Sequence, residues 1–245
     1  MRLQGRDQGR GGKRIAGPLT IGITGGGSGS GKTLMAGLLL ARLRGWGAIK
    51  FTRTEFYTSL IDDEETLRTP GKDTSRMLEA GAEKAIWVQS PGGEELAEAL
   101  GMAVFKLSGQ KGIIIEGNSA VELLKPDIVI FISASVPKGT ASAVMRMADI
   151  VFLPGEVRAD FSSGRERAFR EDAVFCETEE ACVEEVLRRV KEKVKELIKA
   201  RAAGGRITCR DAREIAERLG VEYRLVGESA DALGIRISAC ELGCF

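Results

Sequence analysis

The stretch that decides the fold is residues 18–33, Pro-Leu-Thr-Ile-Gly-Ile-Thr-Gly-Gly-Gly-Ser-Gly-Ser-Gly-Lys-Thr. An apolar run from Leu19 to Ile23 enters a glycine-rich loop, and residues 26–33 match G-x-x-x-x-G-K-[ST], the P-loop pattern. Residues 34–44 are apolar and contain almost no β-branched side chains, which predicts a helix. The sequence therefore supplies the strand, loop and helix that this motif requires.

The residue types in this loop suit phosphate binding. Glycines allow consecutive backbone N–H groups to point inward around an anion, and the helix that begins near Gly31 adds its positive end. We expect Lys32 to reach the β and γ phosphates and the Thr33 hydroxyl to hold Mg²⁺, with GTP or ATP as the nucleotide. The alternative is a glycine-rich turn that binds nothing. The predicted phosphate-binding residues are Gly26, Gly27, Ser28, Gly29, Ser30, Gly31, Lys32 and Thr33.

Composition narrows the function classes. The 245 residues carry a formal net charge of +1, so nothing in the overall charge indicates a nucleic acid or membrane partner. No run of about 18 apolar residues exists and the basic N-terminus lacks an apolar core, so we expect a cytoplasmic protein. The sequence has no histidine, which removes the usual general base. Proton transfer must then use carboxylates, lysine or water.

Apolar segments alternate with predicted helices from residue 18 to residue 178. This alternation predicts an α/β P-loop fold with a mainly parallel sheet flanked by helices. Residues 55–71 read as a long polar connection with an acidic cluster at 62–65. The strands predicted after the P-loop strand are 48–52, 84–89, 112–116, 127–133, 149–153 and 173–176.

Glu116 follows the most strongly apolar of these segments, Ile113-Ile114-Ile115. A buried parallel strand of this kind delivers its terminal residue to the carboxyl edge of the sheet, where P-loop ligands sit. We therefore expect Glu116, with Thr33, to bind Mg²⁺ or its water shell. The alternative is a strand-end glutamate that faces solvent.

The flanking segments are less specific. Residues 1–17 read as a basic disordered tail, and 179–201 as a long amphipathic helix whose apolar stripe serves either its own domain or a dimer seam. After a linker, residues 206–245 form a small helical or α+β module. Its helix–turn–helix pattern lacks the basic charge that DNA binding requires, because six basic residues face seven acidic ones.

Three cysteines, Cys209, Cys240 and Cys244, fall in this C-terminal module. Three thiolates can bind a metal, so these residues are a candidate metal site. The alternative is that they are small apolar residues of a buried core.

Residues 69–76, Thr-Pro-Gly-Lys-Asp-Thr-Ser-Arg, run into Glu-Ala-Gly-Ala at 79–82. With the P-loop and Glu116-Gly117, this segment resembles the molybdopterin-guanine dinucleotide biosynthesis protein B family over about residues 18–155. The resemblance implies a P-loop protein that binds GTP, hydrolyses it slowly, forms dimers and assists nucleotide attachment to molybdopterin. It places Asp73 in a switch-like segment, so the implied catalytic residues are Lys32, Asp73 and Glu116.

Two departures from that family bear on the nucleotide and its chemistry. The family often has histidines after the second strand, where this chain has Phe51-Thr52-Arg53-Thr54, and no Asn-Lys-x-Asp guanine signature is present. GTP and ATP therefore both remain open.

The leading hypothesis is slow nucleotide hydrolysis in an accessory protein of molybdenum-cofactor biosynthesis, partnered by a molybdopterin guanylyltransferase or a molybdoenzyme. The alternatives are a nucleotide- or metal-sensing regulator or metal-handling switch with the C-terminal module as its output, and a small-molecule kinase.

Overall fold

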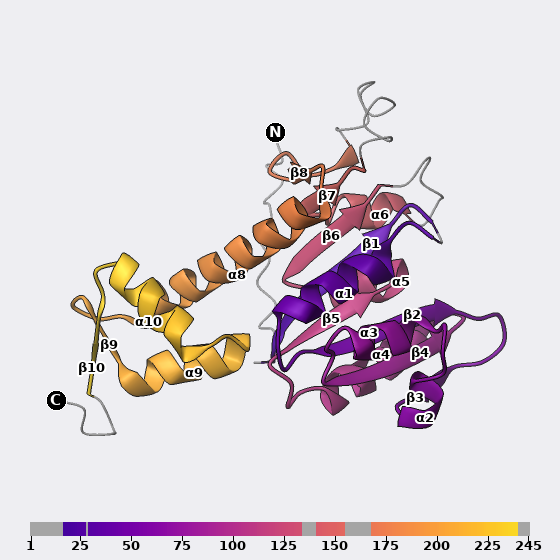
Figure 1. The fold of residues 1–245 in the computed structure, drawn as a ribbon, viewed down its shortest axis with the longest axis horizontal. Coiled ribbons are helices and arrows are strands. Elements are labelled where there is room, and N and C mark those ends of the chain that lie inside the picture. The colour runs from indigo at the N-terminus through magenta and orange to yellow at the C-terminus, as the bar shows by residue number, and fades with distance from the viewer. Residues whose placement is uncertain (1–16, 28, 134–140, 155–167, 240–245) are drawn as a thin grey trace, which may run out of the picture.

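The computed structural model describes residues 17–27, 29–133, 141–154 and 168–239, which form one large sheet, its helices and a small C-terminal lobe (Figure 1). Within these residues the sheet has eight strands in the order β3-β4-β2-β5-β1-β6-β7-β8. Only β3 runs antiparallel to its neighbour; the other pairs are parallel. The strands are β1 (Leu19–Gly25), β2 (Gly47–Arg53), β3 (Ser59–Ile61), β4 (Lys84–Ser90), β5 (Gly112–Glu116), β6 (Ile128–Ile132), β7 (Ile150–Phe152) and β8 (Val174–Cys176).

Helices cover both faces of this sheet. Strand residues alternate between the two apolar layers: Ile114 of β5 belongs to one layer, and Ile113 and Ile115 belong to the other. The first layer contains α1 (Lys32–Arg42), α3 (Asp73–Glu79) and α8 (Glu179–Arg201). The second contains α4 (Gly93–Lys106), α5 (Asn118–Leu124) and α6 (Ala141–Met145). The predicted α/β fold is confirmed.

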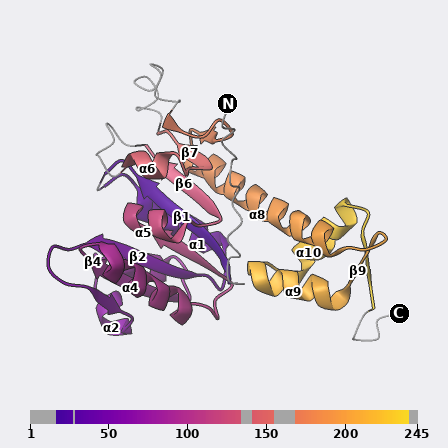
Figure 2. The same ribbon diagram turned by 180° about the vertical axis from the view of Figure 1, so that it is seen from behind.

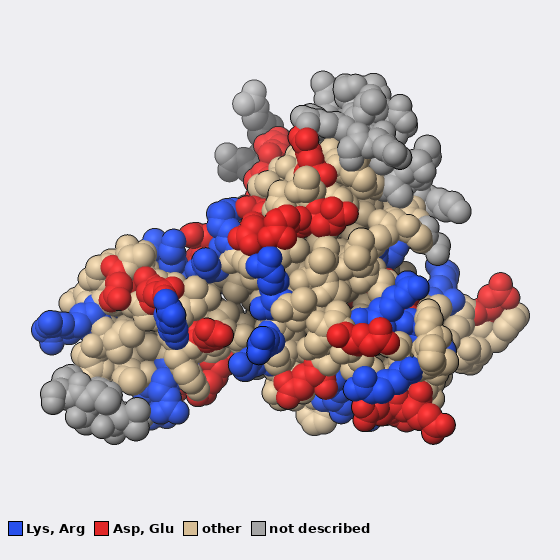
Figure 3. Space-filling model, in the orientation of Figure 1, with Lys and Arg blue, Asp and Glu red and all other residues tan. Residues whose placement is uncertain are grey.

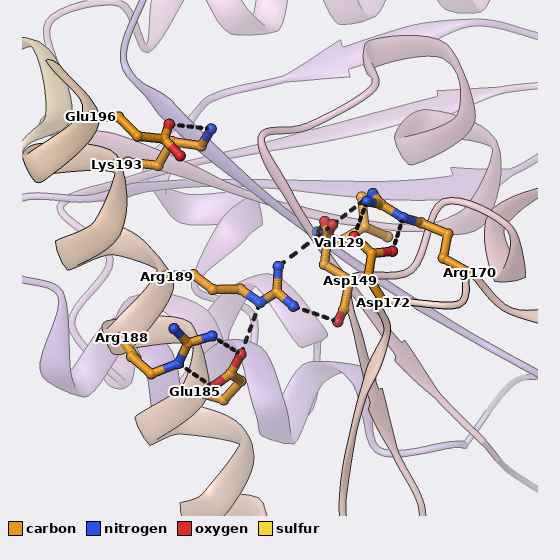
Figure 4. A network of polar contacts seen from close by, with 9 residues as sticks. All are labelled: Val129, Asp149, Arg170, Asp172, Glu185, Arg188, Arg189, Lys193 and Glu196. Carbon is orange, nitrogen blue, oxygen red and sulfur yellow. Dashed lines mark hydrogen bonds and ion pairs between the residues drawn. The ribbon is translucent and has the colours of Figure 1, made fainter. Parts of the chain in front are cut away.

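Helix α8 contacts strands β7 and β8, helix α1 and the C-terminal lobe, and its apolar stripe, which includes Val186, Val190 and Val194, is buried among them. Because this stripe is buried within the chain, it docks on its own domain, and the interpretation of the same stripe as a dimer seam is wrong. Polar contacts also fasten the helix to the start of β7 (Figure 4). Arg189 donates to the backbone oxygen of Asp149 at 3.1 Å and to Glu185 at 3.0 Å.

The Asp149 carboxylate organises the neighbouring strand ends. One oxygen accepts a hydrogen bond from the backbone N–H of Val129 at 2.9 Å, and the other accepts one from Arg170 at 2.9 Å. Arg170 is held in turn by Asp172 (Figure 4). This cluster pins β6, β7 and the segment before β8 at the edge of the sheet opposite to β3.

The C-terminal lobe packs on the end of α8 (Figures 1 and 2). It contains α9 (Cys209–Leu219), α10 (Tyr223–Ala232) and a parallel pair of short strands, β9 (Arg206–Thr208) and β10 (Arg236–Ser238). Thr208 caps α9 by accepting the Asp211 N–H at 3.0 Å, and Gly220 ends the helix in the left-handed region. The lobe is α+β, as expected, and its apolar residues join the core layer of α1 and α8.

Several elements were not predicted. The polar connection at 55–71 contains β3 and the short helix α2 (Glu64–Leu67), and α5 and β9 also went unseen. The predicted tail at 1–17 lies outside the described residues apart from Gly17, and the predicted domain boundaries at 178 and 206 stay predictions. In the described ranges, no helix has the length and apolar character needed to cross a membrane.

Candidate functional site

The loop between β1 and α1 leaves open the space that a phosphate would need. Gly29 and Gly31 have φ values of 75° and 90°, which glycine adopts without strain. A Cβ at either position would meet no heavy atom within 4 Å. The N-cap residue of α1 is Gly31, which has no side chain that could cap the helix, so among the described residues the first N–H groups of α1 are open to an anion.

Lys32 points back into this loop. Its ammonium group donates hydrogen bonds to the carbonyl oxygen of Gly27 at 2.5 Å and to the Ser30 hydroxyl at 3.0 Å. Burial lowers the pKa of Lys32, although the Glu116 carboxylate opposes this shift. The ammonium is therefore directed into the predicted phosphate cradle. Ser28 lies outside the described residues.

The predicted metal-binding side chains meet beside the loop. The Thr33 hydroxyl donates to Glu116 Oε2 at 3.0 Å, and the Asp73 carboxylate lines the same cleft. Glu116 is 1% exposed, whereas Asp73 sits at the rim of the cleft as the first residue of α3. A hydroxyl and two carboxylates are the hard oxygen donors that Mg²⁺ prefers. The residues present therefore fit this cation.

Lys50 completes the cluster, and the sequence analysis missed it. Its ammonium lies 2.6 Å from Asp73 Oδ2 and also forms an ion pair with Glu116. Burial by itself would lower the pKa of Lys50, but Glu116 and Asp73 outweigh that effect and raise it. The available signal was a lysine inside the predicted strand 48–52, whose other residues are apolar or carry a hydroxyl, because buried lysines are usually paired.

Asn118 is a second residue that the sequence analysis missed. Its side-chain oxygen accepts the Gly25 N–H at 3.1 Å, and its amide nitrogen donates to the Gly25 carbonyl at 3.0 Å. This two-point contact joins the start of α5 to the last residue of β1. Asn118 therefore fixes where the P-loop begins without occupying the phosphate cradle.

These groups line a cleft of about 760 Å³ at the carboxyl edge of the sheet. Its described walls include the P-loop, the end of β2, the first turn of α3 and residues 116–119. The charged side chains on them are Lys32, Lys50, Arg53, Arg76, Asp73 and Glu116. Cations therefore outnumber carboxylates, which favours a polyanionic ligand in this cleft.

The cysteines are not brought to this cleft. Cys209 begins α9 in the C-terminal lobe, whereas Cys240 and Cys244 lie outside the described residues. Across the part of the chain that the structure describes, no three His, Cys, Asp or Glu side chains are grouped to hold a metal. The predicted thiolate site stays a prediction.

Comparison with known proteins adds no argument about the cleft. No family model matches the sequence, and no curated protein matches it. Among solved structures, the crystal structure of HypB from Helicobacter pylori in complex with nickel is similar, with a TM-score of 0.45 and 18% sequence identity. The likeness covers 74% of this chain and 89% of that chain. The interpretation of the cleft depends on the residues of this chain alone.

Proposed function

We propose that the chain binds a nucleoside triphosphate, together with Mg²⁺, in the P-loop cleft and hydrolyses it slowly. The observation that carries this proposal is the meeting of Lys32, Thr33, Asp73 and Glu116 at one open cleft with surplus positive charge. The loop N–H groups and Lys32 would bind the phosphates. Thr33, Asp73 and Glu116 would hold Mg²⁺, which supplies charge neutralisation on the phosphate oxygens when bound.

Slow turnover follows from the available bases. The sequence has no histidine, and the carboxylates of Asp73 and Glu116 face a cation, which is the Lys50 ammonium in the structure and would be Mg²⁺ when the metal is bound. A carboxylate that pairs with a cation is a poor acceptor for a proton from water. Hydrolysis would therefore depend on positioning and on electrostatic stabilisation of the transferred phosphoryl group.

The proposed cellular role is that of an accessory protein in molybdenum-cofactor biosynthesis. The segment that carries the resemblance to the molybdopterin-guanine dinucleotide biosynthesis protein B family contributes Asp73 to the cleft, which supports a nucleotide-dependent role for it. A cytoplasmic location, a homodimer and a molybdopterin guanylyltransferase or molybdoenzyme partner belong to the same proposal.

Calorimetric titration of the full chain with GTP and with ATP, in the presence of Mg²⁺, tests nucleotide binding. Lys32→Ala should weaken the preferred nucleotide by about 10- to 100-fold, because hydrogen bonds to charged groups are worth about 1.5–3 kcal/mol. Lys84→Ala, at the opposite end of the sheet, is the matched control and should bind as the wild type does. Equal affinity in wild type and Lys32→Ala would reject the phosphate site.

The fate of the γ-phosphate separates hydrolysis from the kinase alternative. With labelled nucleotide and purified protein, release of inorganic phosphate at a low rate supports the proposal. Transfer of the label to an added small molecule, with little free phosphate, would instead favour a kinase. Elemental analysis of anaerobically purified protein addresses the metal-handling alternative, which requires a stoichiometric metal.

A further inference from the structure

We propose that Lys50 is a resident counter-cation for Asp73 and Glu116, and that it competes with a divalent metal ion for these two carboxylates. This inference rests on the proposed function, since it concerns the same cleft. It assigns to Lys50 a positioning role in metal and nucleotide binding. None of the predicted motifs contains this residue.

The sheet itself places Lys50 there. In the parallel pairing of β2 with β5, Lys50 is the register partner of Glu116, so both side chains leave the same face of adjacent strands. Helix α3 then brings Asp73 to the other side of the ammonium. The Lys50 side chain is 15% exposed, so its position is set by its neighbours rather than by solvent.

Both carboxylate oxygens of Glu116 already have partners. Thr33 donates to Oε2 and Lys50 pairs with Oε1, while the glutamate side chain has almost no exposure to water. Before Glu116 and Asp73 can both coordinate a divalent cation, Lys50 has to give up at least part of its contact with them. Two like charges that share one pair of carboxylates repel each other, so occupation by one weakens the other.

Lys32 and Arg76, two of the other cations of the cleft, are not placed for this role. Lys32 is committed to Gly27 and Ser30 within the loop. Arg76 comes within 3.9 Å of Asp73, but its side chain is 64% exposed. Lys50 is therefore the cation that the described part of the cleft holds against both carboxylates.

Once released from the carboxylates, the Lys50 ammonium could contact a phosphate bound in the cleft. Lys50 lines the cleft together with Lys32 and Arg53, and its four-carbon side chain is flexible enough to turn toward a phosphate. Metal on the carboxylates and triphosphate in the cleft would then each favour the same position of Lys50. Binding of metal and binding of nucleotide would be coupled through this one side chain.

The test measures Mn²⁺ binding to the nucleotide-free full chain by electron paramagnetic resonance, comparing wild type with Lys50→Met. Lys50→Met should bind one Mn²⁺ more tightly by about 5- to 150-fold, the usual range of coupling between two ligands. Lys84→Met is the matched control and should equal the wild type. Adding Glu116→Gln to Lys50→Met should abolish the gain.

Two further measurements keep the proposal open to refutation if Lys50→Met does not fold. Lys50→Gln also removes the charge and should show the same gain, whereas Lys50→Arg should bind Mn²⁺ as weakly as the wild type. In the wild type, the ¹³Cε resonance of Lys50, assigned from Lys50→Arg, should shift when Mg²⁺ and nucleotide are added together.

Equal Mn²⁺ affinity in wild type and a folded neutral variant, or an unmoved Lys50 resonance in nucleotide-bound protein, would overturn the competition. Nucleotide binding by the wild type tests the proposed function separately from this competition. If the wild type binds nucleotide but the neutral variants gain no Mn²⁺ affinity, the competition fails and nucleotide binding stands. If the wild type binds neither GTP nor ATP, the proposed function fails whatever the Mn²⁺ titration shows.

Discussion

The indole N–H of Trp46 donates a hydrogen bond to the carbonyl oxygen of Gly220, 3.4 Å away. Trp46 lies between α1 and β2 and is completely buried, whereas Gly220 ends α9 in the C-terminal lobe. The lobe and the sheet domain thus meet at a turn where the two backbones come very close. That closeness makes the turn sensitive to a single added carbon atom.

Gly220→Ala should destabilise the chain by at least about 2 kcal/mol. Gly220 has φ +63°, and an added Cβ would lie 1.8 Å from the backbone oxygen of Lys111. The left-handed conformation costs an L-residue about 1–2 kcal/mol, and overpacking adds about 1–3 kcal/mol. Urea unfolding followed by circular dichroism measures the loss.

Gly227→Ala is the control for this prediction. Gly227 lies inside α10, and a Cβ there would meet no heavy atom within 4 Å. Alanine should be neutral or stabilise the helix by up to about 1 kcal/mol. Equal unfolding curves for Gly220→Ala and wild type would show that the turn is not packed as described.

Asn118→Asp should weaken nucleotide binding although Asn118 lies outside the phosphate cradle. Aspartate can still accept the Gly25 N–H, but it cannot donate to the Gly25 carbonyl and would place a negative charge beside that oxygen. Losing one such bond costs about 1–3 kcal/mol, so the start of the P-loop should loosen. Calorimetry with the preferred nucleotide checks this, and Glu122→Gln, at an exposed position of the same helix outside the cleft, should leave affinity unchanged.

Glu116→Gln should separate metal-dependent from metal-independent nucleotide binding. The amide removes a charged donor for Mg²⁺ but leaves Lys32 and the loop N–H groups in place. Nucleotide affinity in EDTA should therefore stay near the wild-type value, while the increase produced by Mg²⁺ should largely disappear. A full Mg²⁺ effect in this variant would remove Glu116 from the metal site.

Glu185 should make the stability of the α8 contact depend on pH. The hydrogen bond from Arg188, together with Arg189, lowers the pKa of Glu185 below its ordinary value of 4.5. Its stabilising contribution is therefore complete above that value and is lost as the pH falls through the lower folded-state pKa. Wild type should exceed Glu185→Gln in stability at pH 7, and the difference should shrink toward pH 3.

Denaturant midpoints at several pH values measure this convergence. Glu196→Gln on the same helix is the control, because the Glu196 side chain is 65% exposed in its pair with Lys193 (Figure 4). Exposed pairs contribute little, so its midpoints should follow the wild type at every pH. A difference between wild type and Glu185→Gln that does not change with pH would contradict the prediction.

The P-loop and the carboxyl-edge position of Glu116 could be predicted because both depend on short-range sequence. A motif of eight residues predicts the phosphate-binding loop, and a run of isoleucines predicts a buried strand, without knowledge of the rest of the chain. Lys50 could not be paired with Glu116 in this way, since 66 residues separate them in the chain. Their contact exists because β2 and β5 are neighbours in the sheet. The order of the strands cannot be predicted from the local sequence of either strand.

Short elements were missed for a different reason. Strand β3 has three residues, too few to show a period, and it forms by antiparallel pairing with β4. In α8 the apolar stripe was visible in the sequence, but a stripe does not say which surface covers it. In the structure, the sheet domain and the C-terminal lobe of the same chain cover the stripe.

In Figure 3 the lobe lies to the left of the sheet domain, and acidic and basic side chains are exposed on both. Beneath that surface, α8 gives Val190, Val194 and Ile198 to a core that α9 and α10 also line. In a protein shortened after residue 201, the apolar face at this end of α8 would be exposed to solvent. The nucleotide-binding part expressed by itself should therefore aggregate. Soluble protein should require either the C-terminal lobe or polar substitutions on the exposed face of α8.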